Sequence, residues 1–543
     1  MEIWSQLYFN FFFVGSFIVF SVCAAFAVFL LRLKNKSSAT RHFGIALAFL
    51  AVFNAAYLIP YSIYHPLAAY HRWITVGTIL PALLHFSQFL LRFPDCDHPR
   101  FTRFMLWAQW LIHIGICSAF IFISSQTGTF FNVQGHYFDL DADAISTIQS
   151  GFILAYIMFS VFIGIWRCVI RRGVQRWALL AQALILFFVM MIPAVLNSLS
   201  RDGRVSRELF QNAYAIFLVI GLFIMVVVFL NTTPDRTSFM SKIIGISLAT
   251  FLLIMQVLSY RTLSRRDADF DTLKKEEAGR VLLGGKAPAD LVWLRSVNLK
   301  TGQLKTHNGA APLATDANLL FFTAWREGVG APEISKHLTG AGTKIWFTYL
   351  NQWVAAKQSQ GDRFALLEEK FSVLKHRLSR LTPQNFRQRA DALLAKQEGA
   401  EQDAADFIRQ EMRSSRLEAK ELRQNVTDKF VLPLKSGSRA YPEKNGQQFV
   451  SFRWYDAASG SVLEAGYSYL QYRAYIRDAA LDFFLLTLGG LFLLLTVFPV
   501  FFYLALVDPL KALLTGVSRV NEGNLESEVK VVVEDEIGTL ARS

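Results

Sequence analysis

Apolar and polar positions divide the chain into membrane-length apolar runs joined by short polar connections. Nine runs contain no Asp, Glu, Lys or Arg, and each is close to the ~20 residues that a helix needs to cross the hydrocarbon core. The runs are residues 8–31, 43–64, 73–91, 104–124, 148–166, 177–198, 212–230, 243–259 and 483–507. The pattern predicts a mainly α membrane protein with about nine transmembrane helices.

Basic residues collect in alternate loops between these runs. The basic loops are residues 32–42, 92–103, 167–176 and 231–242. The loop 125–147 has no Lys or Arg and carries Asp139, Asp141 and Asp143. Because cytoplasmic loops are enriched in Lys and Arg, we expect the N-terminus outside and the C-terminus in the cytoplasm of a multi-pass inner (plasma) membrane protein.

The order of the runs predicts five segments along the chain. A seven-transmembrane module at 1–231 is followed by a cytoplasmic loop and an eighth membrane helix at 232–260. Residues 261–477 form an extracytoplasmic domain, 478–507 the ninth membrane helix, and 508–543 a cytoplasmic segment. The net charge of +13 sits largely in membrane-flanking loops, so it indicates lipid rather than nucleic acid as the partner.

The outer segment mixes helical and strand patterns. A charged helix continues out of the eighth run, and two alternating stretches around 291–309 and 447–476 predict β-hairpins. Residues 363–381 show a heptad spacing, and 385–424 read as another charged helix. This layout resembles the Cache/PAS-like sensor domains, and a helical-bundle sensor is the alternative.

The segment after the ninth run starts with a narrow apolar stripe. Pro509 stands in the first turn of a predicted helix, where a missing N–H costs little. Leu510, Leu513, Val517 and Val520 follow at 3-4-3 spacing, which suits a parallel coiled coil with a second copy of the chain.

A connector and the beginning of a second helix follow this stripe. Gly523-Asn524-Leu525 ends the first helix, and Asp535-Glu536-Ile537-Gly538 opens the next. With Pro509 and the heptads, these motifs resemble the HAMP signalling module. The resemblance implies a homodimeric four-helix bundle that switches between two packings, with Pro509, Leu510, Leu513, Val517, Gly523, Glu536 and Gly538 in the signal relay. Because the second helix has barely begun, we expect the chain to be a fragment that lacks an output domain.

The seven-span block also has a family likeness. ILPALLHFSQFLLRFPD at 79–95 is similar to the third-span region of bacterial seven-helix modules on histidine kinases and cyclases. The whole arrangement resembles the input half of membrane-bound class III adenylate/guanylate cyclases. That likeness implies a missing output domain that uses ATP and a divalent metal. A sensor histidine kinase is the alternative output, and a membrane transporter is a different class of interpretation.

Candidate chemistry within this chain is sparse. AGRVLLGGKAP lacks the spacing and hydroxyl of a phosphate-binding loop, and we expect no catalytic residue, metal site or cofactor in this chain. Arg453, Tyr455 and Tyr467 flank the second hairpin and are the candidate binding residues for an unknown small-molecule ligand, against simple packing as the alternative.

Two further features of the membrane block are open to a functional or a structural interpretation. His85 and His113 could pair inside the membrane to sense a ligand or protons, against ordinary interhelical hydrogen bonding. The acidic stretch DLDADA at 139–144 is interpreted as a solvated loop, because Ala144 stands where a calcium loop needs Gly.

Overall fold

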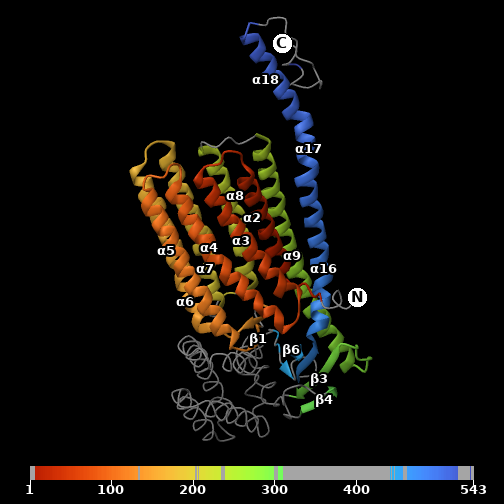
Figure 1. Ribbon diagram of the computed structural model, residues 1–543. Helices are drawn as coiled ribbons and strands as arrows, with labels where there is room; N and C mark the ends of the chain where they lie inside the picture. Colours follow the sequence, from red (N-terminus) through yellow and green to blue (C-terminus); the bar gives the residue numbers. More distant parts are fainter. Residues whose placement is uncertain are drawn as a thin grey trace, which may run out of the picture. The chain divides into compact units, whose positions relative to one another are not determined.

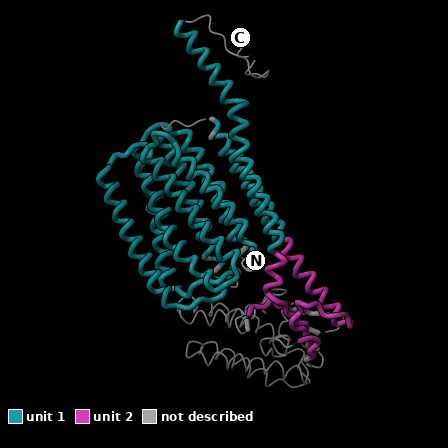
Figure 2. The backbone as a smooth tube through the Cα atoms, turned by 45° about the vertical axis from the view of Figure 1, so that its right-hand side comes forward, with its two compact units in different colours: residues 1–264, 477–543 teal, residues 265–476 magenta. Residues whose placement is uncertain are grey.

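The computed structural model shows a helical bundle and a small sheet (Figure 1). It describes residues 7–132, 135–201, 205, 207–233, 239–298, 304–309, 439, 441, 443–444, 447–456, 461–523 and 539. The chain divides into two compact units, residues 1–264 with 477–543, and residues 265–476 (Figure 2). The predicted helices at 363–381 and 385–424 lie outside the described residues.

The first unit is built from long apolar helices. Among the described residues, nine helices are long and apolar enough to cross a membrane, which confirms the fold class predicted from the apolar runs. The first eight are α2 Phe13–Arg32, α3 Ser38–Ser62, α4 His71–Arg92, α5 Pro99–Ser125, α6 Asp143–Ile170, α7 Val174–Arg201, α8 Arg207–Thr232 and α9 Phe239–Leu282. The ninth candidate span is the helical run from Tyr469 to Asn521.

Local signals in the connecting loops set where several of these helices begin. Ser37 caps α3, because its Oγ accepts a hydrogen bond from the Thr40 N–H at 3.1 Å. Pro99 occupies the first turn of α5, where the backbone N–H has no intrahelical partner in any case. His65 caps the short 3-10 helix η1, Pro66–Tyr70, which leads directly into α4.

Aromatic rings fill much of the core where α3, α4 and α8 meet. Phe43 and Phe89 stack with ring centroids 4.6 Å apart, and Phe229 contacts them at 5.4 and 5.6 Å. All three side chains are fully buried. The apolar side chains of α3, α4 and α8 therefore form a close-packed part of the unit.

A short hairpin connects α5 to α6. Strand β1, Thr129–Asn132, pairs antiparallel with β2, Tyr137–Leu140. The sequence interpretation of a solvated acidic loop is wrong for Asp139, which is 8% exposed and forms an ion pair with Arg72 of α4 at 3.2 Å. A buried carboxylate needs such a partner, so Asp139 fastens the hairpin to the bundle.

The second unit contains a five-stranded antiparallel sheet in the order β4-β3-β7-β6-β5. The strands are β3 Leu291–Asn298, β4 Leu304–Asn308, β5 Glu443–Lys444, β6 Gln447–Asp456 and β7 Ser461–Ser468. Both predicted hairpins, β3–β4 and β6–β7, are therefore confirmed, and so is the continuation of α9 beyond the apolar run.

The two faces of this sheet carry different side chains, with aromatic rings on one face and an ion pair on the other. On one face Phe452 and Tyr467 are buried against the C-terminal half of α9, where Phe270 lies 6.2 Å from Phe452 between ring centroids. On the other face Arg295 and Glu464 form a buried ion pair. A β-carbon at Gly466 would overlap the Trp293 ring, so this glycine permits the close approach of the ring.

Candidate functional site

One helical run continues from the second unit into the first unit and ends in the C-terminal segment. It consists of α16 Tyr469–Phe492, the π-helix η4 Leu493–Val497, α17 Phe498–Phe502, the π-helix η5 Tyr503–Val507 and α18 Asp508–Asn521. We call this run the transmitter helix. Figure 1 shows it as the long blue helical run that carries the labels α16, α17 and α18.

Two prolines explain the two π segments of the transmitter helix. A proline ring clashes with the carbonyl four residues earlier and has no N–H to bond it. Four residues before Pro499 stands Leu495, and four before Pro509 stands Ala505, and each is the middle residue of a π segment. The wider π turn relieves both conflicts, and such turns often mark functional positions in helices. The transmitter helix therefore departs from α-helical geometry at two defined places.

Within the first unit, the transmitter helix touches its neighbours through rings and a glycine. Phe484 contacts the rings of Phe13 and Phe17 of α2 with centroids 5.5 and 4.7 Å apart. A β-carbon at Gly490 would meet the Phe251 ring of α9 at 2.1 Å, so only glycine allows this approach. Small residues commonly permit close helix packing in membranes.

The predicted relay residues lie on α18 and its end. Pro509 is buried, Leu513 is half-buried, and Leu510 and Val517 are 42% and 50% exposed. Gly523 ends the helix with φ +93°, a left-handed conformation that favours glycine. Exposed apolar side chains at this spacing form a stripe without cover from the described part of the same chain. The predicted relay residues Glu536 and Gly538 lie outside the described residues.

The predicted ligand residues occupy both faces of the sheet. Strand pairing puts position 453 opposite Glu464 and position 450 opposite Tyr467. Since residues alternate along a strand, 453 and 455 share the face of Glu464, and Tyr467 belongs to the other. Tyr467 is fully buried and its hydroxyl donates to the Lys274 carbonyl at 2.6 Å. The sheet therefore does not bring the three predicted positions together, and the ligand assignment stays a prediction.

A cluster that the sequence did not indicate joins the two helices of the second unit. Arg439 binds Asp267 of α9 at 2.7 Å and also pairs with Asp271, one turn further along α9. Its guanidinium lies over the Tyr472 ring of α16, 4.8 Å from the centroid, and the Tyr472 hydroxyl donates to Asp267 at 2.7 Å. We call these four residues the stem clamp. Arg439 is 168 and 172 residues from its hydrogen-bonded carboxylates, so no local pattern could have revealed it.

The electrostatics of the stem clamp keep its arginine charged. Burial lowers the pKa of Arg439, but Tyr441, Tyr472 and the two carboxylates raise it further, so the pKa lies well above the usual value. The side chain is 9% exposed, and a buried charge of this kind needs its partners. The clamp therefore fixes the spacing of α9 and α16 as long as its ion pairs are intact.

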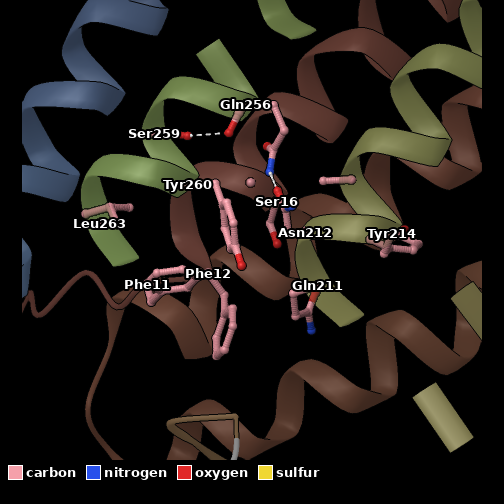
Figure 3. Close-up of a pocket in the computed structure, with 12 residues that line it drawn as sticks. Phe11, Phe12, Ser16, Gln211, Asn212, Tyr214, Gln256, Ser259, Tyr260 and Leu263 are labelled. Carbon is pink, nitrogen blue, oxygen red and sulfur yellow. Dashed lines mark hydrogen bonds between the residues drawn. The ribbon is translucent and has the colours of Figure 1, made fainter. Parts of the chain in front are cut away.

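A small polar pocket lies inside the first unit between α2, α8 and α9 (Figure 3). Its volume of about 20 Å³ is enough for one water. Gln256 of α9 donates to the Asn212 side chain of α8 at 3.2 Å, while its own Oε1 is buried with no partner in the described structure. The pocket is suited to a water that joins these helices by hydrogen bonds.

The membrane histidines form a different pair from the predicted one. Nδ1 of His85 lies 2.7 Å from Nδ1 of His42 on α3, and the two rings stack with centroids 4.9 Å apart. His113 instead contacts the Trp110 ring at 5.5 Å. One Nδ1 of the His42–His85 pair must carry a proton and the other accept it, which is ordinary interhelical hydrogen bonding. Among the described residues, no three His, Cys, Asp or Glu side chains form a cluster that could hold a metal.

Comparison with known proteins identifies one segment of the chain. The HAMP domain family matches residues 501–543, which include α18 and the end of the ninth span. No curated protein and no solved structure matches the chain. A HAMP domain joined to several long apolar helices indicates a signal-transducing multi-pass membrane receptor.

Proposed function

We propose that the chain is the input half of a bacterial membrane receptor whose transmitter helix passes a stimulus to a cytoplasmic output domain. The observation that carries this proposal is the HAMP match at 501–543 on a helix that is unbroken from Tyr469. A helix without a break transmits rotation or displacement along its axis. Output domains downstream of such a relay respond to its change in packing.

The proposed topology follows the basic loops, with the N-terminus and residues 261–477 outside and the C-terminus in the cytoplasm of the inner membrane. In this arrangement an unknown small molecule acts on the outer segment, on the helical block or on both. The stem clamp supports the proposal, because it fixes α9 to α16 at the start of the transmitter helix. A stimulus that opens the clamp would free α16 to move relative to α9.

The proposed assembly is a homodimer through the stripe Leu510, Leu513, Val517 and Val520. Three of these side chains are 40 to 50% exposed, and the 3-4-3 spacing suits a parallel coiled coil. HAMP domains typically occur in dimeric membrane receptors, which supports the same arrangement. The lipid membrane is the other proposed partner.

The proposed output is a class III adenylate or guanylate cyclase that uses ATP and a divalent metal. The likeness of PLKALLTGVSRVNEGNLESEV to HAMP segments of such cyclases supports this choice. A histidine kinase is the alternative, because the same relay precedes both classes of output.

Disulfide cross-linking tests the proposed dimeric relay. In the full chain, with its four native cysteines replaced by alanine, Val517→Cys is compared with Thr515→Cys in native membranes. The two positions lie roughly 200° apart around α18, so we expect efficient cross-linking at 517 and little at 515. Equal or absent cross-linking at both positions would contradict the proposed dimer.

An activity assay tests the proposed output. Membranes that carry the receptor in its natural gene context are assayed for cyclic nucleotide formation and for phosphohistidine. Cyclic nucleotide without phosphohistidine supports the cyclase, and the converse supports the kinase. Solute uptake by reconstituted vesicles, with neither enzyme activity, would replace the receptor proposal with a transporter.

A further inference from the structure

An apolar cavity of about 340 Å³ lies within the first unit, between α2, α8, α9 and the π segment of the transmitter helix. Its volume falls in the range of small-molecule sites, ~300–1,000 Å³. The walls are aliphatic and aromatic side chains that include Phe26, Phe29, Phe223, Val227 and Leu248. This part of the lining accepts a hydrocarbon chain.

One end of this cavity is polar and positively charged. Lys242, near the start of α9, and Asn231, at the end of α8, both line it, and the Lys242 ammonium donates to Asn231 Oδ1 at 2.9 Å. That bond uses one of three ammonium donors. The first turn of α9 carries no acidic residue, and the partial positive charge of a helix N-terminus adds to that of Lys242. This end of the cavity is therefore complementary to an anion.

The cavity also contacts the transmitter helix. Leu495 lines it and is the middle residue of the π segment Leu493–Val497. The Pro499 ring cannot donate a hydrogen bond to the Leu495 carbonyl, so the backbone at this point is less constrained than in an α-helix. An occupant of the cavity would therefore contact the transmitter helix at one of its two π segments.

We propose that this cavity binds an anionic amphiphile, with one hydrocarbon chain between α2, α8 and α9 and its carboxylate or phosphate at Lys242, and that occupancy sets the position of Leu495. The binding half of the inference stands independently, and the regulatory half rests on the proposed relay function. A free fatty acid and one chain of an anionic phospholipid share this chemistry.

Photolabelling of the full chain tests the binding half. The probe is a long-chain fatty acid with a diazirine near its methyl end, and the uncharged probe is its methyl ester. We expect labelling of the cavity peptides to fall about tenfold in Lys242→Gln, because a charge-assisted contact is lost, and to be retained in Lys242→Arg. Lys34→Gln removes an exposed charge outside the cavity and should label like the unsubstituted chain.

Two results would overturn the binding half. Equal labelling of the unsubstituted chain and Lys242→Gln, or equal labelling by the acid and its ester, would make the cavity an ordinary lipid-facing groove. Val227→Trp, which fills the cavity from α8, should abolish labelling while Lys242 is still present. Vesicles of phosphatidylglycerol or phosphatidylcholine with the same diazirine chain then distinguish a phospholipid from a free acid as the source.

Cross-linking at Val517→Cys tests the regulatory half separately. Addition of the fatty acid should change the cross-linking yield at least twofold, and Leu495→Ala should remove that response without removing photolabelling. Val500→Ala, on an exposed position of the same helix, is the matched control and should respond normally. A yield that ignores the fatty acid would refute regulation while binding stands. No cross-link under any condition would refute the relay function instead.

Discussion

The helix α4 and the transmitter helix differ in what holds them. In the span that contains α4, 83% of the most apolar window is buried, against 6% in the run from Tyr469 to Asn521. Yet the transmitter run is the more apolar of the two. Apolar composition therefore marks a helix for the membrane but does not say whether it packs against protein or lipid.

Polar groups account for much of the difference. On α4, Ser87 exchanges hydrogen bonds with the Gln109 side chain of α5 at 3.1 and 3.2 Å, and His85 pairs with His42 of α3. The membrane part of the transmitter helix instead touches the bundle through the Phe484 ring and the close approach at Gly490. Interhelical polar bonds fix α4 in one place, whereas a helix held mainly by a few apolar contacts can shift at little cost.

The largest expected effect on the free energy of unfolding comes from a substitution on α4, the more buried of the two helices. Phe89→Ala removes a fully buried ring from the cluster with Phe43 and Phe229. Buried Phe-to-Ala changes lower the free energy of unfolding by ~3–5 kcal/mol. We expect the lower end of this range, because in detergent the ring of the unfolded chain is already partly removed from water. Reversible unfolding in mixed micelles measures the free energy of unfolding.

The matched control for this prediction is Phe492→Ala on the transmitter helix. Phe492 is 63% exposed, so its truncation should change the unfolding free energy by no more than ~0.5 kcal/mol. Similar losses for both variants would mean that the two helices are held equally, and the comparison would fail.

An intermediate effect, on the position of α16, is expected at one of two adjacent glycines of the transmitter helix. Gly490→Leu would drive a side chain into the Phe251 ring, and overpacking of this kind costs ~1–3 kcal/mol. Gly489→Leu is the control, because a β-carbon there meets nothing within 4 Å. We expect Gly490→Leu to displace α16 and alter cross-linking at Val517→Cys, and Gly489→Leu to leave it unchanged. The same cross-linking yield in both variants would show that the Gly490 contact does not position the helix.

The sequence predicts some features of this fold better than others. Apolar runs predict the nine candidate spans found among the described residues, because no soluble element needs so many consecutive residues without a charge. Strand alternation around a short turn predicts β3–β4 and β6–β7, since both the pattern and the pairing are local. The HAMP segment is recognisable because its proline, heptads and connector have fixed spacing over a short stretch.

The features that the sequence does not reveal depend on contacts between distant residues. The stem clamp joins Arg439 to Asp267 across 172 residues, and any of several arginines could have filled that role from sequence alone. His85 has a neighbour on α3 rather than His113, because helix order and rotation decide which polar groups meet. The strand register separates positions 453 and 467, which seemed close in the sequence but lie on opposite faces.

A small effect on stability, with a change in the rotational phase of α18, is expected from the first proline of the transmitter helix. Pro499→Ala restores an N–H that can bond the Leu495 carbonyl, so the π segment Leu493–Val497 should return to α-helix. Because this segment is largely exposed, the unfolding free energy should change by less than ~1 kcal/mol. Removal of the wide turn rotates everything beyond it by about one residue, roughly 100°.

That rotation predicts a measurable change of phase in α18. A cysteine scan from 510 to 520 should show its cross-linking maxima moved by one position in Pro499→Ala, with total yield preserved. Pro509→Ala is the matched comparison, because it removes the second π segment, Tyr503–Val507, and should produce the same shift at the same places in α18. If the maxima stay on 510, 513, 517 and 520 in both variants, the π segments do not set the phase of the relay. The weak attachment of the transmitter helix to the bundle would then reflect only how little of it is buried.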